Sequence, residues 1–467
     1  MPLVWAFFAI ALGCVLVWSF TPIPSLRPRW AGIMLAAGVG TAGGIGVQSC
    51  VYFVCRLIAP PAIWLGIPVE AVLLAWAVWK LVRGHGRQPS AKKDSAPIPS
   101  VLVLAGALIG VVGLGVGAIS TSWDANPNGD WDAWSIWNLR ARYLAAPDGL
   151  ANRAWSAQLA GTHPEYPLLT SSFIASCWAY GGATTDAVPM ATECLFYLAL
   201  VAIGIGGVAV TRSGSLGILY GMILASTPLL IHESTVQYAD VPVACFMLGA
   251  ALLAMADQPV VAGLFAGFAA WTKDEGLLFL VIFLIAIAIF RRRQLPRTII
   301  GAAAPLALVL FFKLVLARGS ASLPARSTHG LMARIADWRR YGFAGGAMLG
   351  GLAAMGAAFY HPIYPAVVLA ALLRFARGQK RAILFCTLLG AGMLLGYFIT
   401  YVVSPDDIRW LVGTTVDRLT VQVWPLLLLI LFAALRPPEE MVEALVPVAV
   451  RAPRGKAARK KRQSHAP

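Results

Sequence analysis

An all-α integral membrane protein is the fold class that the sequence predicts. Of its 467 residues 59% are hydrophobic and only 12% are charged, whereas soluble domains carry about 25% charged residues. Apolar stretches of about 20 residues, long enough to cross a bilayer, recur between positions 3 and 435. Basic residues form short clusters between these stretches, as the positive-inside rule predicts. The net charge of +16 therefore points to membrane lipids as partners and argues against nucleic acid.

If the basic clusters are cytoplasmic, they fix the direction in which each apolar segment crosses the membrane. We expect about 11–13 crossings from hydropathy. The long loop before the middle of the chain would then be extracytoplasmic and carry juxtamembrane helices, because its tryptophans favour the membrane–water interface. The expected parts are three N-terminal helices (1–82), a cytoplasmic linker (83–100), a transmembrane module (101–317) with the external loop (122–186), C-terminal helices (318–436) and a basic cytoplasmic tail (437–467).

The placement of three segments determines on which side of the membrane the later parts of the chain lie. Residues 168–180 are apolar but short, and we treat them as a juxtamembrane helix. Residues 341–375 hold prolines that favour a broken or partly re-entrant helix. Residues 404–419 are expected to form an external loop before a last helix at about 420–435.

Acidic residues in or beside a membrane are costly, and each is therefore a functional candidate. Asp130 and Asp132 lie two residues apart in the external loop. One of them could act as a general base, although both could equally be solvated loop acids. Asp240 begins an apolar segment, where a simple helix-capping role is slightly more probable than catalysis if it is taken alone.

A charged turn separates two apolar segments at residues 272–276 (TKDEG). It could be a solubilising turn only. Lys273, however, is an isolated external cation, well placed to pair with a lipid phosphate.

Five segments, in order, resemble the GT-C class of membrane glycosyltransferases, in particular bacterial members of the polyprenyl- or dolichyl-phosphate-mannose–protein mannosyltransferase type. The first is residues 129–142 (GDWDAWSIWNLRAR). The others are 163–168 (HPEYPL), 237–242 (QYADVP), 272–276 and, more weakly, 404–418. The resemblance covers about 101–435 and leaves the first three helices without a counterpart. It implies a GT-C-like bundle.

The resemblance also implies roles for particular residues. Asp132 would be the base or orienting group for the acceptor, and Asp240 would position the acceptor or shape the site. Lys273, Arg418 and, less directly, Arg140 would hold the carrier phosphate. The remaining substrate-binding residues that the matching segments imply are Asp130, Trp137, His163, Glu165, Tyr166 and Glu275.

The sequence therefore predicts an enzyme of the bacterial inner membrane with its active site on the extracytoplasmic side. The expected reaction transfers a hexose or pentose from a polyprenyl-phosphate sugar donor to a glycan, lipid or protein acceptor, with inversion. The seven cysteines have no metal-binding spacing, and no metal site is expected, although a need for a divalent ion stays open. A transporter or flippase for lipid-linked glycans is the alternative, but it should carry its ionisable residues at mid-membrane depth.

Overall fold

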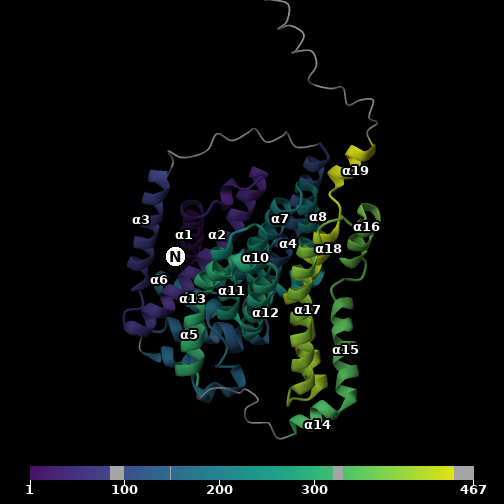
Figure 1. The fold of residues 1–467 in the computed structure, drawn as a ribbon. Helices are drawn as coiled ribbons and strands as arrows, with labels where there is room; N and C mark the ends of the chain where they lie inside the picture. Colours follow the sequence, from purple (N-terminus) through teal and green to yellow (C-terminus); the bar gives the residue numbers. More distant parts are fainter. Residues whose placement is uncertain (85–98, 148, 319–329, 446–467) are drawn as a thin grey trace, which may run out of the picture.

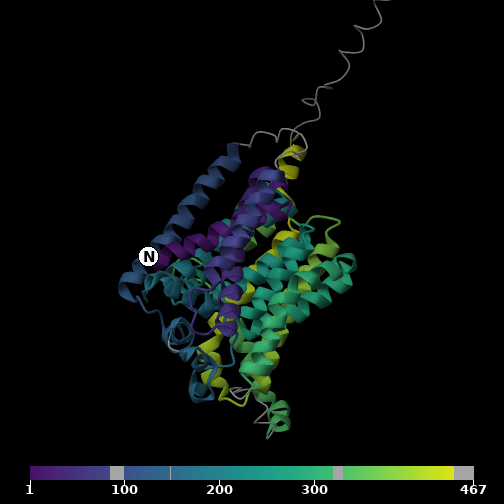
Figure 2. The ribbon, with the colours of Figure 1, turned by 90° about the vertical axis from the view of Figure 1, so that its left-hand side faces the viewer.

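The computed structural model describes residues 1–84, 99–147, 149–318 and 330–445. Within these ranges the chain forms helices and two isolated β-bridges, and no strand. The bundle is elongated, with α14 (Leu331–Ala336) at one end and α19 (Pro438–Leu445) at the other (Figures 1 and 2). The all-α prediction is confirmed for the described part of the chain.

Seven helical stretches in the described ranges are long and apolar enough to cross a membrane. The chain is therefore a multi-pass membrane protein. These stretches are α1 (Pro2–Phe20), α2 (Arg29–Ile58), α4 (Pro99–Ala125), α7 (Ala187–Thr211), α13 (Leu295–Phe311) with its π-helical extension η7 (Phe312–Leu316), α17 (Lys380–Val403) and α18 (Ile408–Ala434).

The further crossings that hydropathy predicts fall on other helices, most of them shorter. These are α3 (Gly66–Gly84), α8 (Gly214–Ala225), α10 (Asp240–Met255), α11 (Pro259–Thr272), α12 (Asp274–Phe290), α15 (Trp338–Ala353) and α16 (Ile363–Leu373). At about 1.5 Å per residue, the 16 residues of α10 span about 24 Å, less than the roughly 30 Å of a hydrocarbon core. The total of 11–13 crossings stays a prediction.

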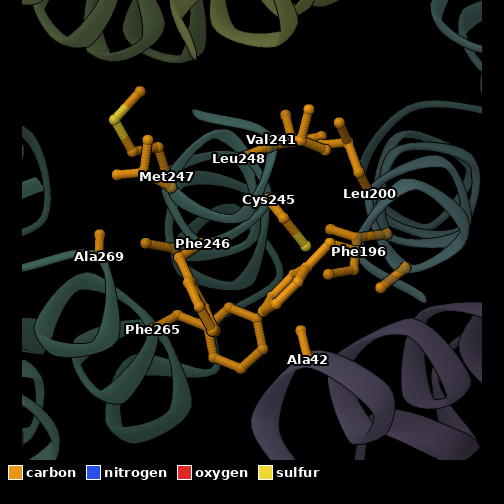
Figure 3. Close-up of a cluster of buried hydrophobic side chains, with 14 of the residues drawn as sticks. Ala42, Phe196, Leu200, Val241, Cys245, Phe246, Met247, Leu248, Phe265 and Ala269 are labelled. Carbon is orange, nitrogen blue, oxygen red and sulfur yellow. The ribbon is translucent and has the colours of Figure 1, made fainter. Parts of the chain in front are cut away.

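Helix α10 lies at the centre of the bundle, where short length is tolerated because protein surrounds it. Phe246 of α10 packs edge-on against Phe196 of α7 and Phe265 of α11, with ring centroids 5.5 and 5.4 Å apart. Figure 3 shows these rings between the neighbouring helices, with Cys245 and Leu248 on other sides of α10. Because α10 lies at the centre of the bundle, its first residue, Asp240, is buried inside the protein.

The expected external loop folds into short helices, as its composition predicts. They are η3 (Ala133–Trp137, a π-helix), α5 (Asn138–Ala145), η4 (Leu150–Trp155), η5 (Ala157–Thr162) and α6 (Leu169–Gly181). Helix α6 has only 13 residues and packs against α1, α2 and α5. At about 20 Å long, it is shorter than the roughly 30 Å of a hydrocarbon core, but so are α8 and α16, and its assignment as a juxtamembrane helix stays a prediction.

The stretch 341–375 contains two helices, α15 and α16, separated at residues 354–362. Helix α15 lies towards the α14 end of the bundle and α16 towards the α19 end (Figure 1). Together they form one interrupted passage along the bundle, in line with the expected broken helix.

One expected boundary is wrong. Residues 408–419 are not a loop, because α18 begins at Ile408 and runs to Ala434. The Asp407 side chain caps this helix by accepting hydrogen bonds from the backbone N–H groups of Arg409 and Trp410, at 2.9 and 3.0 Å. Polar residues in the first turns of α18 lower the mean hydropathy, so a hydropathy scan misses this part of the helix.

Two smaller boundaries also differ. Helix α4 begins at Pro99, inside the expected linker 83–100, and α19 occupies the start of the expected tail 437–467. Residues 85–98 of the linker and 446–467 of the tail lie outside the described residues.

Candidate active site

Asp240, the first residue of α10, is fully buried and surrounded by hydrogen-bond donors. Lys273, which links α11 to α12 in an extended conformation, places its Nζ 2.8 Å from Asp240 Oδ1. Arg418 of α18 donates from Nε to Oδ2 at 3.1 Å, and the Gln422 amide donates to Oδ1. Tyr397 of α17 donates its hydroxyl proton to the Gln422 side-chain oxygen at 2.6 Å. These contacts satisfy a carboxylate that would otherwise be costly to bury.

The Arg418 guanidinium joins Asp240 to the external loop. Its Nη1 lies 2.7 Å from Asp132 Oδ2, so one guanidinium contacts two carboxylates from segments far apart in the chain. The guanidinium also lies 4.5 Å from the ring centroid of Tyr238, whose hydroxyl accepts the backbone N–H of Asp132 at 3.4 Å. Asp132 and Arg418 are 18% and 14% exposed, whereas Asp240 is 0% exposed. The outer carboxylate is therefore the one that a substrate can reach.

The first turn of α12 extends this series of charges. Glu275 lies 3.2 Å from the Nζ of Lys273, and its neighbour Asp274 lies 2.6 Å from the Nζ of Lys313 in η7. Lys313 also donates to the backbone oxygen of Glu165 at 3.1 Å. Both acids also benefit from the positive end of the α12 dipole. Cations and carboxylates thus alternate from Asp132 to Glu275, and the adjacent Asp274 pairs separately with Lys313. We call these seven residues the charge series.

The segment 163–166 packs beside the charge series on a buried arginine. Arg140 is fully buried, donates from Nη1 to the backbone oxygen of Tyr166 at 2.7 Å and lies 5.2 Å from the Trp137 ring centroid. The Tyr166 ring stacks on Trp137 and on His163, with centroids 5.9 and 4.6 Å apart. Burial lowers the pKa of Arg140 to about 10, partly offset by the charge of Glu165. Arg140 therefore holds the loop in place by bonds to main chain.

Asp130 lies outside this arrangement. It is exposed, and its carboxylate accepts a hydrogen bond from the Asn126 amide at 3.0 Å. The neighbouring Trp131 and Trp134 are 66% and 47% exposed and pack edge-on, with centroids 4.5 Å apart. Of the two loop acids, only Asp132 belongs to the charge series.

The structure adds residues that the sequence analysis did not select. Lys313 and Gln422 contact members of the charge series, and each is a single polar residue at the end of, or inside, an apolar stretch. Glu193 of α7 and Glu233 at the end of α9 (Pro228–Glu233) are buried, at 1% and 5% exposure. Burial, with a smaller effect of the Asp240 charge, raises the pKa of Glu233 to about 8. Glu193 is a single acid within an apolar segment, and the cost of an acid in a membrane makes it a functional candidate that the sequence could have indicated.

No group of three or more His, Cys, Asp or Glu side chains suited to a metal ion occurs within residues 1–84, 99–147, 149–318 and 330–445. Comparison with family models, curated proteins and solved structures gave no match for this chain.

Proposed function

We propose that this protein is a membrane glycosyltransferase of the GT-C class. It would transfer a sugar from a polyprenyl-phosphate donor to an extracytoplasmic glycan, lipid or protein, with inversion at the anomeric carbon. The observation that carries the proposal is the Arg418 guanidinium shared between the accessible Asp132 and the buried Asp240. The resemblance of the segments that bear these residues to GT-C enzymes supports it.

The chemistry needs a proton acceptor on one side of the anomeric carbon and positive charge on the other. Asp132 takes the proton of the acceptor hydroxyl, whose oxygen forms the new bond to the anomeric carbon. The bond from that carbon to the phosphate oxygen breaks, and polyprenyl phosphate leaves with the electron pair. Lys273 and Lys313, the cations of the charge series that do not contact Asp132, stabilise the developing negative charge. Asp240 holds Lys273 and Arg418 in position, and Arg418 orients Asp132.

The proposed location is the bacterial inner membrane, with the charge series on the extracytoplasmic side. Arg334 of α14 donates to the backbone oxygen of Val403 at 2.9 Å, so the α17–α18 connection lies at the α14 end of the bundle. Helix α19, after which the sequence is rich in lysine and arginine, lies at the opposite end. The positive-inside rule assigns that opposite end to the cytoplasm.

A direct test measures the release of polyprenyl phosphate, the product common to all such donors. Purified protein in lipid nanodiscs is given a panel of polyprenyl-phosphate hexoses and pentoses with membrane-extract acceptors. We expect Asp132→Asn to lower kcat/KM by about 10²–10⁴-fold. The matched variant Asp130→Asn, which changes an exposed acid outside the series, should stay within about threefold of the parent protein. Equal activity of the two variants would show that Asp132 is not the base. Absence of turnover with every donor would refute the proposal that the protein is a glycosyltransferase.

A transporter or flippase of lipid-linked glycans is the second candidate. The observation in its favour is Glu193, a buried acid within the long helix α7, since transporters carry ionisable residues within the membrane. Movement of a fluorescent lipid-linked glycan across proteoliposomes, lost in Glu193→Gln and unaffected by Asp132→Asn, would favour this reading over the enzyme.

A further inference from the structure

An apolar groove of about 590 Å³ opens on the side of the bundle between α2 and α13. This volume falls within the roughly 300–1,000 Å³ of ligand pockets. The groove is lined by aliphatic and aromatic side chains and one cysteine: Val47, Cys50, Val51, Val54, Leu57 and Ile58 of α2, Leu264 and Phe268 of α11, and Ala304, Pro305, Ala307, Leu308 and Phe311 of α13. From Val47 to Ile58 it follows α2 for about 16 Å, at 1.5 Å per residue. These dimensions suit one extended hydrocarbon chain.

The groove lies between α2 and α13, with Leu264 and Phe268 of α11 forming its floor. Helix α13 packs closely on α11, where a Cβ on Gly263 would lie 1.9 Å from the Thr298 backbone oxygen. On the other side, a Cβ on Gly46 of α2 would lie 2.6 Å from the Phe268 ring. Side chains as small as Ala304 and Ala307 on α13 leave space above α11. A backbone contact therefore sets the α13 side of the groove, and the Phe268 ring sets the α2 side.

One end of the groove leads to the charge series. Phe311 lines the groove, and Lys313, two residues further along, pairs with Asp274. Between them Phe312 packs against Phe53 and Trp271, with ring centroids 6.3 and 5.8 Å apart. This aromatic contact closes the protein-facing side of the groove where the charges begin.

We propose that the groove holds the isoprenoid chain of the lipid-phosphate donor and that Lys313 takes its phosphate. The assignment rests on the proposed function and names where that donor binds. A single chain with a single phosphate fits a single narrow groove that ends at a cation. Asp274, the partner of Lys313, is adjacent in the chain to Glu275, from which ion pairs lead to Asp132. The sugar beyond the phosphate then lies towards the base. Helix α2 is outside the part of the chain that resembles GT-C enzymes, so this groove is not inferred from that resemblance.

The test compares the dissociation constant of long-chain polyprenyl phosphate among variants, by native mass spectrometry of protein released from nanodiscs. Ala307→Phe fills the groove. Ala107→Phe adds the same ring to α4 at an exposed position away from it. We expect the first to weaken binding at least tenfold and the second to change it less than twofold. Ala304→Leu, a smaller change in the same groove, replaces Ala307→Phe if that variant does not fold.

Chain length and head group separate the two parts of the site. A two-isoprene phosphate, too short to fill the groove, should bind weakly, and Ala307→Phe should leave its affinity unchanged. Lys313→Gln should weaken both the short and the long phosphate about tenfold. Equal affinity for phosphatidylglycerol and polyprenyl phosphate would show an ordinary membrane-lipid groove and overturn the proposal, as would equal binding by Ala307→Phe and Ala107→Phe.

The outcome is independent of catalysis. Groove-dependent binding without sugar transfer would refute the proposed function and leave the lipid site standing. Sugar transfer with an unchanged KM for the long-chain donor in Ala307→Phe would refute the lipid site and leave the enzyme standing.

Discussion

The pair formed by Asp240 and Lys273 should show a large energetic coupling, because both side chains are almost fully buried. The side chains are 0% and 4% exposed, and the two charged atoms lie 2.8 Å apart. At an effective dielectric constant of 20 their attraction is about 6 kcal/mol, and removal from water costs several kcal/mol per ion. The two effects largely cancel for the intact pair. Removal of one partner alone should cost about 3–5 kcal/mol, nearer 3 for Asp240→Asn, since Glu275 and Asp132 still pair with the two cations.

The experiment is a double-mutant cycle of Asp240→Asn and Lys273→Met, read as the free energy of unfolding in an SDS titration followed by tryptophan fluorescence. The double variant should be more stable than the sum of the single changes predicts, by about 1–3 kcal/mol. The control cycle uses Asp274→Asn and Lys313→Met, a pair that is 31% and 18% exposed, with an expected coupling of about 1 kcal/mol or less. A coupling at Asp240–Lys273 no larger than in the control would refute the reasoning.

Three further predictions follow from buried groups and close contacts. The pKa of Glu233 is raised to about 8 from about 4.3 in an unfolded chain. Wild-type stability should therefore fall as pH rises from about 5 to 8, and Glu233→Gln should remove this fall, so that its gain in melting temperature over wild type grows through this range. Arg140→Lys should cost about 1–3 kcal/mol of unfolding free energy, because a lysine cannot reproduce the planar contact with Trp137 and the bond to main chain; thermal unfolding with no loss would contradict it. A Cβ on Gly276 would lie 1.8 Å from the Ala269 backbone oxygen, so Gly276→Ala should lower folded yield sharply in size-exclusion chromatography, whereas Gly117→Ala, which has open space, should not.

Much of the fold could be predicted because hydropathy reports what a bilayer requires. The long helices and the folded external loop follow from runs of apolar residues and from interfacial tryptophans. The start of α18 could not be predicted in this way, since its first turns carry polar, mostly exposed residues. Their hydropathy resembles that of a loop.

The same distinction applies to the candidate site, where several residues could be predicted from the sequence but their mutual contacts could not. Asp240 and Lys273 could be selected because each is a charge beside an apolar segment, whereas the choice of Asp132 over Asp130 and the selection of Arg418 rest on the resemblance to GT-C enzymes. The sharing of Arg418 between two carboxylates could not be predicted, since it depends on how α18 packs beside α10. Lys313 looked like an ordinary flanking residue of an apolar helix, and the π-helical turn that directs it towards Asp274 has no evident sequence signal.

The position of Arg418 also has a consequence for biogenesis. During synthesis the translocon releases the segments bearing Asp132 and Asp240 long before α18 emerges from the ribosome. Over that interval Asp240 has Lys273 but not Arg418 beside it, and Asp132 lacks its ion-pair partner Arg418. Insertion of the last long helix completes the arrangement, so a nascent or C-terminally truncated chain would carry every proposed acid without the cation that links them.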